Sequence, residues 1–166
     1  NNTDAKDAQN IIEQISAGED RENAFWPDSG ILMLGGAAIG KSTQLKRFVL
    51  LALKQGMVPV LIELVRLTGH GAGADRAGAA PLANVIERYL ESHHERGSKQ
   101  HRLLMQAVHE RRALFLVDGM DEAGGAKEEI EQAVASELLD QGHKTIVTSR
   151  HSGFKMESFE RCQLVE

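Results

Sequence analysis

Residues 31–43 read Ile31-Leu-Met-Leu-Gly-Gly-Ala-Ala-Ile-Gly-Lys-Ser-Thr43, an apolar run followed by a glycine-rich loop and then by a lysine and two hydroxyl residues. The continuous apolar run predicts a buried strand over Ile31 to Leu34. From Thr43 onward the apolar residues recur at helical spacing, which predicts a helix directly after the loop. The predicted order is therefore strand, glycine loop and helix.

The loop matches the pattern G-x-x-x-x-G-K-[ST] of the P-loop, or Walker A motif. Glycine lets successive backbone N–H groups turn towards phosphate oxygens without a Cβ clash, and the following helix offers the positive end of its dipole. We therefore predict a nucleotide-phosphate site, in which Lys41 bridges the β- and γ-phosphates and the Ser42 hydroxyl ligates Mg²⁺. The predicted nucleotide-binding residues are Gly35, Gly36, Ala37, Ala38, Ile39, Gly40, Lys41, Ser42 and Thr43.

Strands and helices alternate along the rest of the chain. Apolar or β-rich runs predict further strands at residues 58–64, 113–117, 145–148 and 162–165, with helical spacing between them. Gly142 is suited to end the helix that precedes the fourth strand. Parallel strands need long crossover connections, which helices supply. We therefore expect an α/β fold of three layers, the P-loop NTPase fold, with a mostly parallel five-stranded sheet flanked by helices.

An acidic residue, Asp118, follows the apolar run 113–117, where a parallel sheet places its ligand loops. Asp118 is suited to hold the same magnesium ion as Ser42, because Mg²⁺ prefers oxygen ligands such as carboxylates. We interpret this arrangement as a Walker B motif, and Ser42 and Asp118 are the predicted metal ligands.

Three further charged residues are candidates for catalysis. Asp121 and Glu122 follow Asp118 closely enough to polarise a water molecule for attack on the γ-phosphate. Arg150 follows the predicted strand 145–148 and is placed to sense or neutralise the γ-phosphate, because arginine stabilises charge on a transferring phosphoryl group. The alternatives are an acidic loop without a role and an arginine that only pairs with an acid.

These motifs, in this order, resemble the NACHT class of signal-transduction NTPases, which is related to the AAA+ ATPases. The resemblance runs from about Ser29 to Glu166. It is carried by Gly-Gly-Ala-Ala-Ile-Gly-Lys-Ser-Thr-Gln-Leu as Walker A, Leu-Phe-Leu-Val-Asp-Gly-Met-Asp-Glu as Walker B and Thr-Ile-Val-Thr-Ser-Arg as the sensor strand. The run Val60-Leu-Ile-Glu-Leu-Val-Arg66-Leu is similar to the family's second strand. Typical AAA+ proteins have their catalytic glutamate where Gly119 stands, which is the sharpest discriminator.

The resemblance implies that the acids Asp121 and Glu122 activate the attacking water. It also implies ATP or ADP with Mg²⁺ as cofactors, and slow ATP hydrolysis as the nucleotide switch of a larger signalling or oligomerising protein that self-associates. We expect residues 1–28 to form a lead-in helix and linker. Residues 29–166 are expected to form the nucleotide-binding core, truncated before the family's helical lid and winged-helix domains. The first residue, Asn1, is not a methionine, which also suggests a piece of a larger protein.

Composition argues against several other classes of protein. The formal charge of -5 and the lack of a long basic stretch oppose direct binding to nucleic acid. The apolar runs are too short to cross a bilayer and the start has no signal-peptide pattern, so we expect no membrane segment and a cytoplasmic location. The single cysteine, Cys162, is interpreted as a small residue near the core. The adjacent His93 and His94, and His101 and His109 about two helical turns apart, are not spaced to hold one metal ion.

Other segments carry expectations of local structure or contact. Residues 68–81 consist almost entirely of Gly, Ala and polar residues, which predicts a mobile loop. The run Phe25-Trp26-Pro27 precedes the P-loop and is a candidate for contact with the nucleotide base. Gly56 is suited to end the helix after the P-loop in a left-handed conformation.

Three alternatives to an ATP-hydrolysing switch stay open at this point. A non-hydrolysing module would bind nucleotide to stabilise an oligomerisation scaffold. A small-molecule P-loop kinase would leave the run Asp118-Gly-Met-Asp-Glu122 without a role. A regulatory GTPase needs an Asn-Lys-x-Asp element to read guanine, which the chain lacks. The run Asp121-Glu-Ala-Gly124 matches the GTPase Asp-x-x-Gly element but begins too far beyond the strand to reach the metal in the usual way.

Overall fold

The computed structural model describes residues 30–36, 40–67, 85–151 and 155–165. The elements in chain order are β1 (Ile31–Leu34), α2 (Lys41–Lys54), β2 (Val58–Glu63), α3 (Leu64–Leu67), α4 (Val85–His93), α5 (Lys99–His109), β3 (Ala113–Asp118), η1 (Met120–Glu122), η2 (Gly124–Ala126), α6 (Lys127–Ala133), η3 (Val134–Leu139), β4 (Lys144–Ser149), η4 (Met156–Phe159) and β5 (Gln163–Val165). The η elements are short 3-10 turns except η3, which is a π-helix.

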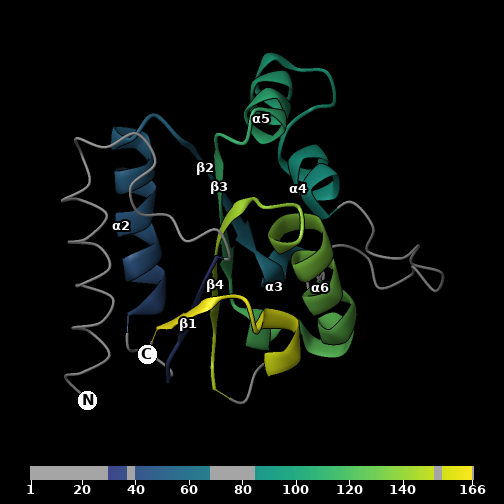
Figure 1. Cartoon of the computed structure of the whole chain (residues 1–166). Coiled ribbons are helices and arrows are strands. Elements are labelled where there is room, and N and C mark those ends of the chain that lie inside the picture. The colour runs from purple at the N-terminus through teal and green to yellow at the C-terminus, as the bar shows by residue number, and fades with distance from the viewer. Residues whose placement is uncertain (1–29, 37–39, 68–84, 152–154, 166) are drawn as a thin grey trace.

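The five strands form one sheet in the order β2-β3-β4-β1-β5, and each neighbouring pair is parallel (Figure 1). The expected α/β fold with a five-stranded sheet flanked by helices is confirmed, and the sheet is parallel throughout. Parallel strands bring their carboxyl ends to one edge of the sheet, where ligand loops lie. β4 lies between β1, which leads into the glycine loop, and β3, which ends at Asp118. The end of β4 is therefore a neighbour of both motifs.

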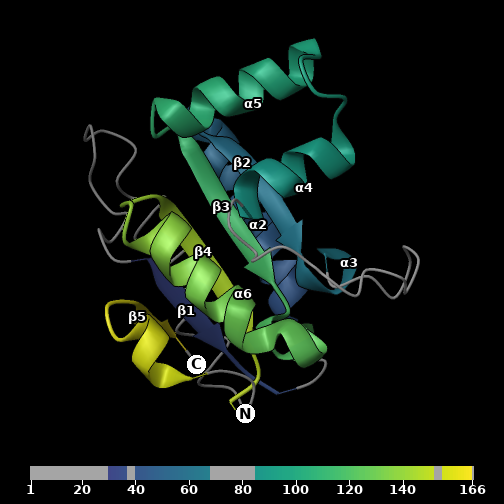
Figure 2. The ribbon, with the colours of Figure 1, turned by 90° about the vertical axis from the view of Figure 1, so that its right-hand side faces the viewer.

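Helices cover both faces of the sheet (Figures 1 and 2). On one face α2 packs through Leu45, Phe48, Leu51 and Ala52 against side chains of β1, β3, β4 and β5. The opposite face is covered by α6 with α4 and α5, and the core on that side includes Ile130. Burial on both faces explains why the strands are continuous apolar runs rather than alternating ones.

Most element bounds follow the sequence expectations. β1 spans the expected residues, and β3, β4 and β5 differ from the expected runs only at their ends. Both helix-ending glycines are confirmed, because Gly56 has a φ of 69° and Gly142 a φ of 71°. After α2, Gly56 N–H donates to the Leu53 carbonyl at 3.1 Å and Met57 N–H donates to the Ala52 carbonyl at 2.8 Å. This pair of hydrogen bonds is a Schellman motif, which ends the helix.

The second strand ends earlier than the sequence indicated. The apolar run predicted a strand through Leu64, but β2 ends at Glu63 and Leu64 begins α3. Leu64 is fully buried in the core on the α6 side of the sheet. Its apolar character therefore reflects burial in the helix that follows the strand, and a short apolar run cannot distinguish the two.

The helix expected before the fourth strand changes its hydrogen bonding part-way. It starts as α6 and becomes the π-helix η3, after which Asp140 N–H donates to the Ala135 carbonyl, five residues back, at 2.8 Å. Apolar spacing predicted the helix but not the wider turn, because a single π segment shifts the periodicity too little to be seen.

Cys162 packs against the core on the α6 side, as expected, and it is half-buried. Burial raises the pKa of its thiol to about 11, so the thiol stays protonated at neutral pH. The lead-in segment 1–28, with Phe25-Trp26-Pro27, and the loop 68–81 lie outside the described residues and stay predictions. Within the described ranges, no helix has the length and apolar character needed to cross a membrane.

Candidate functional site

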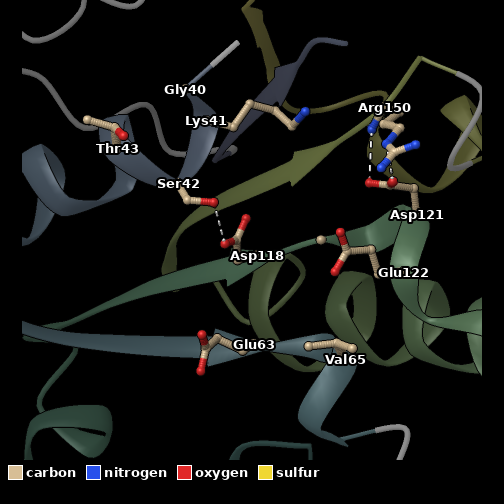
Figure 3. Close-up of a pocket in the computed structure, with 11 residues that line it drawn as sticks. Gly40, Lys41, Ser42, Thr43, Glu63, Val65, Asp118, Asp121, Glu122 and Arg150 are labelled. Carbon is tan, nitrogen blue, oxygen red and sulfur yellow. Dashed lines mark hydrogen bonds and ion pairs between the residues drawn. The ribbon is translucent and has the colours of Figure 1, made fainter. Parts of the chain in front are cut away.

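Site residues from the separate sequence motifs meet at one edge of the sheet, where α2 begins and where β2, β3 and β4 end (Figure 3). A cavity of about 360 Å³ lies there, a volume in the range of small-molecule sites. Gly40, Lys41, Ser42 and Thr43 line it at the start of α2. The other lining residues are Asp118 at the end of β3, Gly119, Asp121 and Glu122 in the turn that follows, Glu63 at the end of β2, Val65 in α3 and Arg150 directly after β4. Segments that are far apart in the sequence therefore share one cavity.

The glycine loop joins β1 to the first turn of α2. Gly35 N–H donates to the carbonyl of Ser149 in β4 at 3.2 Å, and Gly40 precedes α2 with a φ of 92°. No side chain of the described residues caps the first turn of α2, and this turn contains no acidic residue. Its N–H groups and the positive end of the helix dipole therefore favour an anion in the cavity. The predicted binding residues Ala37, Ala38 and Ile39 lie outside the described residues.

The side chain of Lys41 folds back over this loop. Its Nζ donates to the carbonyl of Gly35 at 2.7 Å and to the carbonyl of Gly36 at 2.9 Å. These hydrogen bonds hold the ammonium group beside the cavity that Lys41 lines. A phosphate oxygen would compete for the ammonium group, because an ionised acceptor makes a stronger hydrogen bond than a neutral carbonyl.

The two predicted metal ligands contact each other directly. Ser42 Oγ donates to Oδ2 of Asp118 at 3.0 Å, although the residues are 76 positions apart in the chain (Figure 3). Ser42 lies in the first turn of α2 and Asp118 is the last residue of β3, so helix and strand bring two hard oxygen donors together. Thr43, also predicted, lines the cavity beside them.

Two of the predicted catalytic residues form an ion pair with each other. Arg150 Nε lies 2.8 Å from Oδ2 of Asp121, and the backbone N–H of Arg150 donates to Oδ1 of Asp121 at 3.1 Å. The Asp121 side chain is only 12% exposed, whereas that of Arg150 is 53% exposed and borders the cavity. Both oxygens of Asp121 are therefore engaged in holding Arg150.

The third predicted catalytic residue, Glu122, is exposed and borders the cavity (Figure 3). Gly119 has a φ of 81°, and its carbonyl accepts the N–H of Glu122 at 2.8 Å. A Cβ atom added to Gly119 would lie 3.2 Å from Oε2 of Glu122. This close approach shows that the turn after β3 folds the Glu122 carboxylate back towards the strand end that carries Asp118.

Sequence reasoning assigned no site role to three residues that line the cavity, Glu63, Val65 and Gly119. Glu63 ends β2 and stands beside Asp118 in the strand register. A signal for Glu63 was present, because it is an acidic residue near the end of a predicted parallel strand. Val65 gave no such signal, since its position depends on where β2 gives way to α3.

The cavity has an excess of negative charge. Its lining contains four carboxylates and two cationic groups, which belong to Glu63, Asp118, Asp121, Glu122, Lys41 and Arg150. A divalent cation is therefore expected to strengthen the binding of a polyphosphate here. Among the described residues, no cluster of three or more His, Cys, Asp or Glu side chains is arranged to hold a metal ion by itself. Magnesium still fits the pair Ser42 and Asp118, because it takes few protein oxygens and keeps waters and phosphate oxygens as its other ligands.

No protein-family model matches the chain, and no curated protein matches its sequence. Its function is therefore inferred from its own motifs and from this cavity.

Proposed function

We propose that this chain binds ATP together with Mg²⁺ in the cavity between α2 and the ends of β2, β3 and β4. The observation that carries the proposal is the contact between Ser42 and Asp118, whose side-chain oxygens lie 3.0 Å apart at the first turn of α2. A serine hydroxyl and a strand-end carboxylate at this distance can serve as ligands of one magnesium ion. The glycine pattern and the start of α2 support a phosphate ligand next to that ion.

Different groups of the chain bind the phosphates and the magnesium ion. N–H groups of the glycine loop and of the first turn of α2 donate to phosphate oxygens. Lys41 shifts its ammonium group from the carbonyls of Gly35 and Gly36 to the β- and γ-phosphates. A bound magnesium ion, held by Ser42 and Asp118, supplies positive charge that offsets the carboxylates of the cavity.

We further propose slow hydrolysis of the triphosphate with Glu122 as the general base. Arg150 engages both oxygens of Asp121, so Glu122 is the acid of the two that is suited to take a proton from water. Asp121 in turn holds the guanidinium group of Arg150 on the cavity wall, where its charge can stabilise the transferring phosphoryl group.

The resemblance to NACHT proteins supports four further properties. They are a preference for ATP over GTP, a role as the switch of a larger signalling protein, self-association through that protein, and a cytoplasmic location. We propose these properties for the larger protein, whereas the phosphate and metal contacts belong to residues of this chain.

The binding proposal is tested by titrating the chain with ATP, ADP and GTP in the presence of Mg²⁺. We expect Lys41→Ala to lose triphosphate binding, because the phosphates would then lack their cationic partner. Lys46→Ala is the matched control, since Lys46 is an exposed lysine of the same helix that does not line the cavity. Equal affinity of wild type and Lys41→Ala would overturn the assignment of the phosphate site.

The hydrolysis proposal is tested by turnover in variants that still bind ATP. Glu122→Gln is expected to lower the rate by about a hundredfold or more, because a positioned general base contributes at least that much. Glu129→Gln, an exposed acid in the first turn of α6, is the control and is expected to retain the rate. If wild type and Glu122→Gln bind ATP and share one negligible rate, the chain is a non-hydrolysing nucleotide-binding module.

A further inference from the structure

One hydroxyl group joins the ends of β3 and β4. Thr148 is fully buried in β4, and its Oγ1 donates to Oδ1 of Asp118 at 2.5 Å and accepts the N–H of Gly119 at 3.0 Å. A hydroxyl group buried in a sheet is costly unless it is hydrogen-bonded, and valine would suit this position as well by shape and β-propensity. The two hydrogen bonds therefore point to a role of the hydroxyl beyond the packing of β4.

The first hydrogen bond fixes the orientation of the Asp118 carboxylate. Thr148 holds Oδ1 inside the sheet, while Oδ2 receives the hydrogen bond of Ser42 at the cavity. A hydroxyl donor on an ionised carboxylate at this short distance is among the stronger hydrogen bonds in proteins. One oxygen of Asp118 is thus anchored, and the other is directed to the place of the metal ion.

The second hydrogen bond fixes the turn that carries Glu122. Thr148 accepts the N–H of Gly119, and the carbonyl of Gly119 accepts the N–H of Glu122. Two residues after Thr148, Arg150 binds Asp121 in the same turn. The end of β4 therefore fixes the position of Asp118 relative to the turn that carries Asp121 and Glu122.

We propose that Thr148 is a positioning residue of the site, whose hydroxyl presents Asp118 to the metal ion and holds the turn that carries Glu122. This inference rests on the proposed binding of ATP with Mg²⁺. Because Thr148 acts through Asp118, the metal dependence of nucleotide binding depends on Thr148, whereas the contacts of the glycine loop with the phosphates do not. Loss of the hydroxyl therefore weakens metal-supported binding selectively.

The test compares Thr148→Val, Thr148→Ser and wild type in titrations of Mg²⁺ with a fluorescent ATP analogue, repeated in EDTA. We expect Thr148→Val to raise the Mg²⁺ concentration for half-maximal binding by about tenfold or more, as is usual when a group that orients a metal ligand is lost. Binding in EDTA should stay at the wild-type level. Thr148→Ser keeps the hydroxyl and should restore the wild-type Mg²⁺ dependence.

Thr145→Val is the matched control. Thr145 is also buried in β4, but its hydroxyl donates to the carbonyl of His143 at 2.9 Å, at the opposite end of the strand. This variant should keep the wild-type Mg²⁺ dependence even if its melting temperature falls. Amide hydrogen exchange gives a readout without nucleotide, because exchange at Gly119 should accelerate in Thr148→Val and not in Thr145→Val.

Three results would overturn the role of Thr148 while leaving the proposed function intact. They are an unchanged Mg²⁺ dependence in Thr148→Val, an equal loss of binding with and without Mg²⁺, and a failure of Thr148→Ser to restore the wild-type behaviour. A wild-type chain that binds no nucleotide would instead overturn the proposed function, and the role of Thr148 with it.

Discussion

Gly119 has a left-handed backbone conformation and lies next to the predicted catalytic residue Glu122. Its φ of 81° is a left-handed conformation that a residue with a Cβ adopts at an expense of about 1–2 kcal/mol. A methyl group there would also lie 3.2 Å from Oε2 of Glu122 and push this carboxylate aside. We expect Gly119→Ala to lower ATP turnover by about tenfold to a hundredfold, since a displaced catalytic group loses its alignment.

Gly124→Ala is the control that separates backbone strain from displacement of the Glu122 carboxylate. Gly124 also has a positive φ, of 60°, but a methyl group there would meet no atom of the described residues within 4 Å. Both variants should therefore lose comparable stability in chemical denaturation, and only Gly119→Ala should lose turnover. A similar loss of turnover in both variants would mean that backbone strain alone, and not the position of Glu122, is responsible.

His143 makes the stability of the fold sensitive to pH. Burial of the ring, and to a smaller extent the charge of Arg111, lower the pKa of His143 from its usual 6.5. The ring packs edge-on against Phe115, and its Nδ1 is buried without a hydrogen-bond partner among the described residues. The unfolded chain therefore binds this proton more readily than the folded chain, so stability is lost as the pH falls below about 6.5.

The measurement is the free energy of unfolding at a series of pH values from 7 to 5. His143→Phe keeps an aromatic ring against Phe115 but does not titrate, so its stability should fall less over this interval than that of wild type. His109→Gln removes an exposed histidine and should follow the wild-type curve. If His143→Phe and wild type lost stability in parallel, another group would have to cause the pH dependence.

At the scale of elements, α6 is tied to the segment that leads to η4 and β5. The Glu131 side chain in α6 is only 2% exposed, and its two oxygens accept the N–H of Lys155 at 3.2 and 3.3 Å. We expect Glu131→Ala to lower the free energy of unfolding by about 1–3 kcal/mol, because it removes the acceptor of a part-buried N–H group. Urea denaturation measures this change.

Glu128→Gln is the control on the same helix. Glu128 Oε1 lies 2.8 Å from Nζ of Lys155, but both side chains are largely exposed, so water screens the pair. No measurable loss of stability is expected from this variant. A larger loss in Glu128→Gln than in Glu131→Ala would show that the ion pair, rather than the buried acceptor, holds the segment to α6.

The elements themselves were largely predictable because strands buried on both faces of the sheet are continuous apolar runs. β1 was predicted at its exact residues, and Gly56 and Gly142 end their helices as glycines in left-handed conformation do. The step from β2 to α3 at Leu64 was not predictable, since a buried leucine suits a strand and a helix equally well.

At the scale of the whole molecule, strand order decides which residues meet. The strand-end position of Asp118 predicted that it shares a magnesium ion with Ser42, and the structure places the two side chains in contact. The pairing of Asp121 with Arg150 depends on β3 and β4 being neighbours, which local sequence patterns do not specify. The position of Glu63 beside Asp118 depends likewise on β2 pairing with β3.

The arrangement of the cavity predicts how the whole molecule responds to its ligand. Nucleotide with Mg²⁺ would contact α2 on one side and the ends of β3 and β4 on the other, so it would bind only the folded chain. A ligand at a hundred times its Kd stabilises such a state by about 2.7 kcal/mol. For a chain of 166 residues we therefore expect ATP with Mg²⁺ to raise the Tm by about 5–10 °C, as measured by differential scanning fluorimetry.

The rise in Tm can be assigned to the proposed site by adding EDTA and by comparing two lysine variants. EDTA should abolish most of the rise in Tm, because the carboxylates of the cavity then oppose the phosphates without a cation between them. Lys41→Ala should show little or no rise, and Lys46→Ala should show the full rise. A rise that survives both EDTA and Lys41→Ala would place the nucleotide elsewhere on the molecule, because the start of α2 and the metal pair are the features that this stabilisation requires.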